Sequence, residues 1–155
     1  MQPEALFSLF STLAMIGWVI LIILPRRWSW LNGVPALWIP LALSTGYSLL
    51  IGLYFFQAEG GFDTLQSVQR LFTSPMAALA GWVHYLAFDL LIGCWIARKA
   101  DKLHISRLIQ APILLATFMF GPFGYLLFKL LQGINTLGLG KAKQSKSNQS
   151  LQPAS

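Results

Sequence analysis

The sequence predicts an all-α integral membrane protein, a bundle of four transmembrane helices with a short interfacial helix between the second and the third. Hydrophobic residues make up 55% of the chain and charged residues only 10%, whereas a soluble domain carries about 25% charged residues. The apolar residues fall into four runs, each close to the roughly 20 residues that span the hydrocarbon layer as a helix. Short basic clusters flank these runs, as is typical beside transmembrane helices.

The first two predicted spans cover residues 5–24 and 34–56. The first run contains no charge and ends at Pro25, which is followed by two arginines and two tryptophans. Proline ends a helix, and arginine and tryptophan favour the headgroup level. The second run has Pro35 and Pro40 near its start, where a helix tolerates proline best.

The third and fourth predicted spans cover residues 75–96 and 108–131. Before the third span, residues 57–74 form a polar connection whose second half has helical spacing, which predicts the short helix at the membrane interface. Pro75 suits the first turn of the third helix. The fourth run contains the sequence GPFG at residues 121–124, which is expected to free backbone carbonyls and to kink the helix.

Residues 1–133 are therefore expected to form one transmembrane domain, and residues 134–155 a disordered polar and basic tail. The first and third loops hold most basic residues outside the tail and are expected to be cytoplasmic; they are Arg26, Arg27, Arg98, Lys99, Lys102 and Arg107. Four spans then place both termini on the opposite side, against the preference of the tail's lysines. The alternative is a re-entrant fourth segment, broken at residues 121–122, which returns the tail to the cytoplasmic side.

Two ionisable side chains, His84 and Asp89, lie deep in the third apolar run. A charge at the centre of a bilayer costs about 2.5 to 3.5 kcal/mol even on a lenient scale, so both are expected to mark the interior face of the bundle. Five residues of helix separate them by about 140°, which excludes a shared metal ion on one face. Between them point Gly81 and Tyr85, and this predicts a groove for a long apolar molecule with a polar group.

A structural reading of these residues stays open. The two ionisable side chains could simply bond to hydroxyls of neighbouring helices; the candidate partners are Ser44, Thr45, Tyr47, Ser48 and Thr117. Tyr47 and Tyr85 suit either helix-linking hydrogen bonds or contact with a substrate. Trp82 is better explained by packing or interfacial anchoring, since its one polar atom is a single N–H donor.

The residues that several kinds of binding or catalytic site require are missing from the sequence. The net charge of +6 does not indicate nucleic-acid binding, because the basic residues sit beside apolar runs rather than along an exposed stripe. With one cysteine, Cys94, and two histidines, one of them in a loop, the sequence predicts no metal site and no cofactor. Nucleotide-binding loops and the hydrolase elbow are missing from the sequence. Proton chemistry remains, namely a redox-neutral rearrangement of a lipid by an acid and a base.

Three segments resemble the abscisic-acid-deficient-four-like family, whose plant members are neoxanthin-synthase-like and whose bacterial members form a domain of unknown function. They are LFTSP at residues 71–75, AGWVHYLAFDL at 80–90 and TFMFGPFG at 117–124. The resemblance implies an isomerisation in carotenoid biosynthesis: an epoxide oxygen gains a proton, a chain carbon loses one, and an allene results. It makes His84 and Asp89 the acid/base candidates. It makes four residues pocket-lining candidates, Trp82, Tyr85, Gly121 and Pro122.

The expected partners are the lipid bilayer and a carotenoid or another long isoprenoid, and a membrane protein or a second copy of the chain is a further candidate. The expected location is a bacterial inner membrane, or a thylakoid if the source is cyanobacterial, since the N-terminal residues lack the pattern of a signal or transit peptide. A non-catalytic binder of pigment or protein is the main alternative to an isomerase. A proton-linked transporter is weaker, because the sequence shows no internal repeat.

Overall fold

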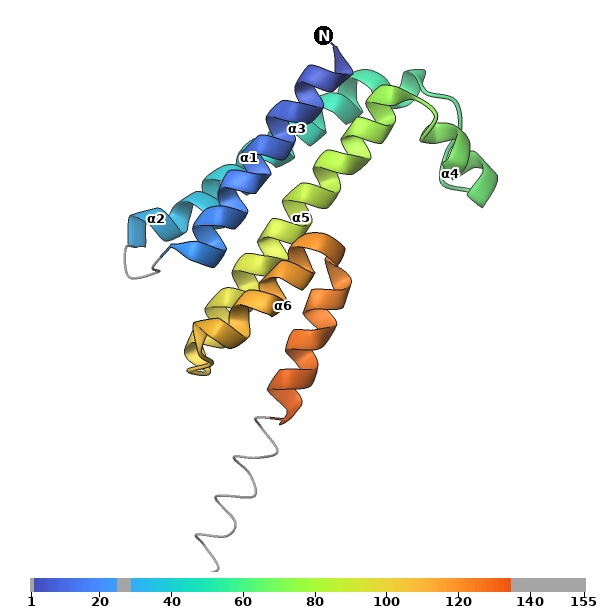
Figure 1. The fold of residues 1–155 in the computed structure, drawn as a ribbon. Helices are drawn as coiled ribbons and strands as arrows, with labels where there is room; N and C mark the ends of the chain where they lie inside the picture. The colour runs from blue at the N-terminus through green and yellow to red at the C-terminus, as the bar shows by residue number, and fades with distance from the viewer. Residues whose placement is uncertain (1, 25–28, 135–155) are drawn as a thin grey trace, which may run out of the picture.

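The computed structural model describes residues 2–24 and 29–134, and the regular elements in these ranges are helices. Three helical stretches are long and apolar enough to cross a membrane: α1 (Pro3–Ile23), the run Leu31–Gln57, and α5 (Pro75–Lys102). They lie beside one another, with α5 next to both others (Figure 1). The all-helical prediction is confirmed for the described residues, and the three long apolar helices are compatible with a membrane protein.

The second stretch contains four consecutive elements rather than one regular helix. These are α2 (Ser29–Gly33), a π-helix η1 (Val34–Trp38), α3 (Ile39–Tyr54) and a closing 3-10 turn η2 (Phe55–Gln57). Pro35 and Pro40 stand in the first turns of η1 and α3, where a missing backbone N–H costs least. The prolines therefore explain why the winding changes at this point of the span.

The predicted interfacial helix exists as α4 (Leu65–Leu71). Thr64 begins it, since its hydroxyl accepts a hydrogen bond from the backbone N–H of Ser67 at 3.1 Å. Pro75 then starts α5 as predicted, but the end of that helix was placed too early at residue 96, because α5 continues to Lys102. Residues 97–102 are good helix formers, and two lysines in the last turn interact favourably with the helix dipole.

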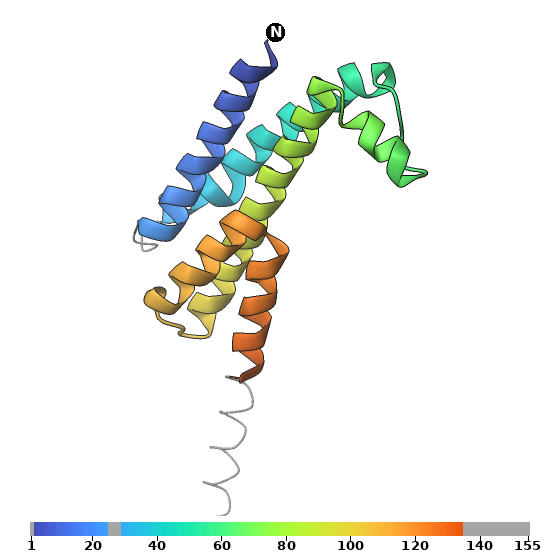
Figure 2. The same ribbon diagram turned by 45° about the vertical axis from the view of Figure 1, so that its right-hand side comes forward.

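The prediction of one helix over residues 108–131 is wrong. α6 (Arg107–Phe120) ends at Gly121, where φ is +34°, and a second helix runs back over residues 122–134. Figures 1 and 2 show the two helices as an upward and a downward arm, called here the C-terminal hairpin. Glycine tolerates the positive φ, and Pro122 has no N–H with which to continue α6. With 14 residues, α6 is only about 21 Å long, less than the roughly 30 Å of a hydrocarbon layer, and the chain turns back at its end, as in the re-entrant alternative.

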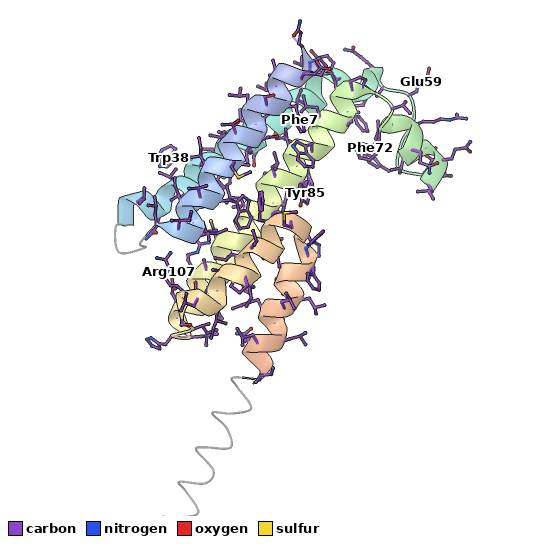
Figure 3. The ribbon with its side chains drawn as sticks, viewed as in Figure 1. Phe7, Trp38, Glu59, Phe72, Tyr85 and Arg107 are labelled. Atoms are coloured by element: carbon purple, nitrogen blue, oxygen red, sulfur yellow. The ribbon has the colours of Figure 1, made fainter. Side chains whose placement is uncertain are left out.

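The hairpin also determines at which end of the molecule the described part of the chain stops. The N-terminus and α4 lie at one end of the molecule, called the upper end, and Arg107 lies at the other, the lower end (Figure 3). Arg98, Lys99 and Lys102 belong to the lower part of α5, and residue 134 also ends there. The fold matches the re-entrant alternative in that the end of the hairpin lies with the basic residues of α5, and the positive-inside rule predicts that this side is cytoplasmic. Residue 134, predicted as the start of the tail, is still helical, and the rest of the predicted tail, residues 135–155, lies outside the described residues.

Close packing between helices depends on two glycines. A side chain at Gly17 of α1 would press on Leu90, and one at Gly93 of α5 would press on the ring of Trp18. Because neither glycine has a side chain, α1 and α5 can approach each other closely, as helices with small residues do in membrane bundles. Trp18 and Leu90 belong to the common core, which also includes the fully buried Phe128 from the second arm of the hairpin.

Candidate functional site

Asp89 is the fifteenth of the 28 residues of α5 and thus lies at its middle. Its side chain is only 5% exposed, because the tip of the C-terminal hairpin covers it. A methyl group built on Gly121 would contact the Asp89 carboxyl, at 2.9 Å from Cγ and 3.0 Å from Oδ2. Among the described residues Oδ2 has no hydrogen-bond partner. The hairpin thus covers an ionisable group in the middle of α5 and leaves one of its oxygens without a partner, which is costly in a dry environment.

Tyr85, one turn before Asp89, joins α5 to the hairpin. Its hydroxyl donates toward the backbone carbonyls of Phe118 and Met119, at 3.2 and 3.0 Å. These carbonyls belong to the last turn of α6, where a helix has no partners of its own for them. The same hydroxyl also interacts with the Asp89 carboxyl. Tyr85 therefore links the hairpin tip to α5 and places a hydroxyl beside the buried acid.

Above Tyr85, aromatic rings continue toward the upper end of the molecule. Trp82 stacks on Tyr85 with 5.4 Å between ring centroids and lies 5.5 Å from the ring of Phe7 in α1. Its indole N–H donates to the Ser11 hydroxyl at 3.0 Å. Phe7, Trp82 and Tyr85 are called here the aromatic row; Figure 3 shows Phe7 and Tyr85 along α1 and α5 above the hairpin.

The upper end of the aromatic row opens into a hollow of about 440 Å³ between the first turns of α1 and α5. Its walls are mostly apolar and include Phe7 and Trp82, while Glu4 and Ser8 supply polar atoms. The hairpin packs against the lower half of α5 and does not reach this hollow (Figure 1). The aromatic row therefore runs from the wall of this hollow, at Phe7 and Trp82, to Tyr85, one turn before Asp89.

His84 lies on another side of α5 and is exposed. Its ring is 5.3 Å from that of Tyr47 in α3 and 4.6 Å from that of Phe88. With Tyr47 and Gly81 it lines a separate cavity of about 280 Å³, under the segment that contains α4. The expectation that both ionisable residues mark the bundle interior is confirmed for Asp89 and wrong for His84.

The predicted site residues thus separate into two groups. Asp89, Tyr85 and Gly121 are in contact, and Trp82 adjoins them, whereas the cavity lined by His84, Tyr47 and Gly81 does not include Asp89. Pro122 only begins the second arm of the hairpin and is exposed. The two groups differ because five residues of α5 turn the side chains of His84 and Asp89 to different neighbours.

The predicted small-residue groove is filled at one point. A methyl group at Gly81 would come within 2.6 Å of the Phe72 ring, so Phe72, just after α4, occupies the space that this glycine leaves. Figure 3 shows Phe72 beside the upper part of α5. Phe72 was not among the predicted site residues, nor were Phe55 and Phe62, which line the same cavity. For Phe62 and Phe72, an aromatic side chain in a polar connection was the available signal; Phe55, at the end of an apolar run, gave none.

Three of the five hydroxyls proposed as structural partners of His84 and Asp89 are bonded within their own helices. The hydroxyls of Thr45 and Ser48 bond to carbonyls four residues earlier in α3. Thr117 does the same in α6, donating to the carbonyl of Ile113 at 2.8 Å. Hydroxyls with such bonds are occupied within their own helices. The reading in which Asp89 serves only to link helices through these groups therefore has no support from the described contacts.

Comparison with known proteins identifies the family. The family model described as "ABA DEFICIENT 4-like" matches residues 5–128, from the first helix into the second arm of the hairpin. No match was found among curated proteins or among solved structures. The matched range covers most of the chain, includes both groups of site residues and confirms the resemblance of the three segments. The chain therefore belongs to the ABA DEFICIENT 4-like family.

Proposed function

We propose that this protein is a membrane-embedded isomerase that rearranges a carotenoid or a related isoprenoid by proton transfer, without a cofactor, and that Asp89 is its proton-transferring residue. The observation that supports this most is the buried carboxyl itself: Oδ2 of Asp89 has no partner among the described residues, at the middle of a spanning helix. Such groups are expensive in a bilayer and are usually functional. Family membership supports a carotenoid-related membrane protein.

The reaction suits a single buried acid with a hydroxyl beside it. A carboxylic acid, which is cheaper to bury than a carboxylate, gives its proton to the oxygen of an epoxide as one C–O bond breaks. A proton then leaves the neighbouring chain carbon and returns to the carboxylate, and the electron pair of that C–H bond forms the new double bond. Atoms and electrons balance, so no electron carrier is required. General acid–base catalysis of this kind contributes typically about 10²- to 10⁴-fold in rate.

The aromatic row supplies the binding surface for the long part of the substrate. A flat conjugated chain stacks favourably on aromatic rings, and Phe7, Trp82 and Tyr85 follow one another at 5.4 to 5.5 Å between centroids. The hollow at the upper end of the row gives access from the lipid. In this proposal the reactive end reaches Asp89 by displacing or flexing the hairpin tip, whose hinge is Gly121.

The supporting hydroxyl beside this acid belongs to Tyr85, and His84 is not part of the reacting pair. The Tyr85 hydroxyl interacts with the carboxyl of Asp89, whereas His84 lies in another cavity. A hydroxyl beside the acid can orient it and hydrogen-bond to the developing alkoxide. His84 remains a candidate for ligand binding away from the reacting atoms.

The test is pigment conversion in a host that makes a varied panel of carotenoids, including epoxides. Asp89→Asn keeps the shape of the side chain and removes the transferable proton, so product formation should fall at least about a hundredfold. Asp63→Asn is the matched control, because Asp63 is exposed in the connection before α4. Equal amounts of each variant in the membrane are verified by immunoblot.

Two results would contradict the proposal. One is an unchanged pigment profile when the unsubstituted protein is present across the whole panel. The other is full conversion by Asp89→Asn. If the purified protein instead retains a pigment unaltered, and Asp89→Asn retains it equally well, the chain is a non-catalytic pigment binder.

A further inference from the structure

A cavity of about 510 Å³ lies toward the lower end of the molecule, where the last turn of α1, the elements α2 and η1, and the lower part of α5 meet. Figure 1 shows α2 beside the lower end of α1. The volume is in the range of ligand pockets. Neither Asp89 nor the aromatic row lines this cavity, so the proposed reaction does not use it.

The wall that η1 contributes contains a backbone carbonyl that a proline leaves without its helical partner. In the π-helix η1 the backbone N–H of Ile39 bonds to the carbonyl of Val34, five residues earlier. In the same register the carbonyl of Pro35 needs an N–H from Pro40, which has none. The thiol of Cys94 in α5 donates to this carbonyl at 3.3 Å. Such π-helical turns occur frequently at functional sites, and this one forms part of the cavity wall.

Two side chains of opposite charge line the cavity from α5. Arg98 and Asp101 are three residues apart, and side chains at that spacing are neighbours on a helix, about 5–6 Å apart at Cβ. Both are exposed. The side-chain amide of the buried Gln110 donates to Oδ1 of Asp101 at 2.9 Å. Because a carboxylate accepts several hydrogen bonds, this bond orients Asp101 and still lets it accept from a ligand.

The two charges stand where α5 leaves the hydrocarbon. Residues 90–97 carry no charge, and Arg98 is the first residue of the basic cluster at the end of the helix. Basic residues in this position mark the headgroup level of the bilayer. One turn closer to the bilayer interior the wall contains Cys94, and the apolar Leu37, which also lines the cavity, is 56% exposed. The cavity thus combines charges at headgroup depth with apolar surface.

We infer that this cavity binds a phospholipid whose headgroup carries both a phosphate and a primary ammonium, as in phosphatidylethanolamine. The guanidinium of Arg98 donates to the phosphate oxygens, which its fork of N–H groups suits. The ammonium donates to the carboxylate of Asp101, and the short linker between phosphate and ammonium matches the spacing of the two side chains. A headgroup with only negative charge is less suitable, because it would face Asp101. The inference does not depend on the proposed isomerisation.

The experiment measures lipid binding to the full-length protein purified in detergent, by native mass spectrometry at a series of lipid concentrations. The probes are phosphatidylethanolamine, phosphatidylcholine and phosphatidylglycerol with identical acyl chains. The methylated ammonium of choline has no N–H to donate, and the glycerol headgroup has no ammonium. Phosphatidylethanolamine should bind at least about fivefold tighter than either of the others, the fold-change that a hydrogen bond worth on the order of 1 kcal/mol produces.

Variants test each charge separately. Asp101→Asn keeps an oxygen that accepts from Gln110 and removes the negative charge, so it should abolish the preference for phosphatidylethanolamine; Asp63→Asn, in the exposed connection before α4, should leave it unchanged. Arg98→Gln should weaken binding of all three lipids several-fold, since each has a phosphate. Its matched control is Lys99→Gln, because Lys99 is also exposed and basic but does not line the cavity. An unchanged gel-filtration position verifies that each variant is folded.

A soluble molecule with the same headgroup offers the same polar groups, so a further probe separates it from a lipid. Glycerophosphoethanolamine carries the headgroup without acyl chains and leaves the apolar wall of the cavity uncovered. At equal concentration it should therefore fail to displace phosphatidylethanolamine. Displacement as effective as that by the lipid itself would overturn a lipid as the occupant.

The inference is overturned if phosphatidylglycerol or phosphatidylcholine binds as tightly as phosphatidylethanolamine, or if folded Asp101→Asn keeps the preference. It is also overturned if Lys99→Gln weakens binding as much as Arg98→Gln, since phosphate would then be attracted by a basic surface and not by a site. Asp89→Asn should leave the binding of all three lipids unchanged, so a failure of the proposed reaction does not affect this site.

Discussion

Replacing Gly121 by alanine tests the contact between the hairpin tip and the buried acid. The glycine has φ of +34°, a region in which any other residue costs about 1–2 kcal/mol. The new methyl group would also meet the Asp89 carboxyl, with Cγ at 2.9 Å and Oδ2 at 3.0 Å. Asp89 is a short side chain that is 5% exposed, so it cannot swing aside freely. Overpacking of this kind costs typically about 1–3 kcal/mol.

Gly121→Ala should therefore lower the free energy of unfolding by about 2–5 kcal/mol, the sum of the backbone and the overpacking costs. In an Asp89→Ala background the carboxyl is gone and only the backbone cost of about 1–2 kcal/mol remains. The two substitutions should thus show a coupling energy of about 1–3 kcal/mol in a double-mutant cycle. The cycle isolates the contact from the effect of positive φ.

Cys94 provides the assay. It is the single cysteine of the chain and is 2% exposed, so a thiol-reactive dye reports unfolding as the detergent-solubilised protein is heated or denatured. Gly52→Ala is the control, because nothing lies within 4 Å of the position in α3; it should stabilise by roughly 0.5–1 kcal/mol. An equal cost of Gly121→Ala in the unsubstituted protein and in the Asp89→Ala background would refute the contact between the hairpin tip and the acid.

Three further predictions concern the hairpin. Tyr85→Phe leaves the carbonyls of Phe118 and Met119 without their donor and should cost about 1–3 kcal/mol in the same dye assay; an unchanged midpoint would remove Tyr85 as the link. In Gly124→Ala the new methyl group presses on the backbone N and Cα of Thr117 as well as on its hydroxyl. Adding Thr117→Ala removes only the contact with the hydroxyl, so it should recover less than half of the stability that Gly124→Ala loses. Full recovery would show that only the hydroxyl was in the way. The third prediction is that residues 106 and 134 lie on one side of the membrane and residue 63 on the other. In vesicles that contain the Cys94→Ala protein, an impermeant maleimide should label Ser106→Cys and Ile134→Cys from one side and Asp63→Cys from the other. Labelling of positions 106 and 134 from opposite sides would mean that the hairpin spans.

The sequence predicts the long helices well because the bilayer imposes one rule. A long apolar run that crosses the bilayer must be helical and about 20 residues long. α1 and α5 are built on such runs, with Pro75 at the first turn as expected. The end of α5 was harder to place, since residues 97–102 are mostly charged yet favour helix. Charge marks where a span leaves the hydrocarbon, not where its helix stops.

The turn of the hairpin could not be predicted from the composition of the segment alone. Residues 108–131 have the length and apolarity of a span, and GPFG predicts a kink of unknown size. Whether the chain continues or turns back is decided by what receives the tip, here Tyr85 and Asp89 on a helix more than thirty residues away. A local pattern does not contain that information. The same reason explains His84, whose depth was read from the sequence but whose direction depends on α3 and on Phe72.

The re-entrant hairpin gives the two halves of α5 different surroundings, and this difference bears on where chemistry can occur. Below Asp89 the helix packs on α6 and the second arm, with Ile96 and Ala97 completely buried. Above it, Trp82 and Phe88 stay 39% and 52% exposed. Asp89 stands at the boundary, 5% exposed and covered by the hairpin tip. In the proposed reaction a substrate that lies along the aromatic row reaches the acid when this tip is displaced, which a short arm permits more readily than a full fourth span.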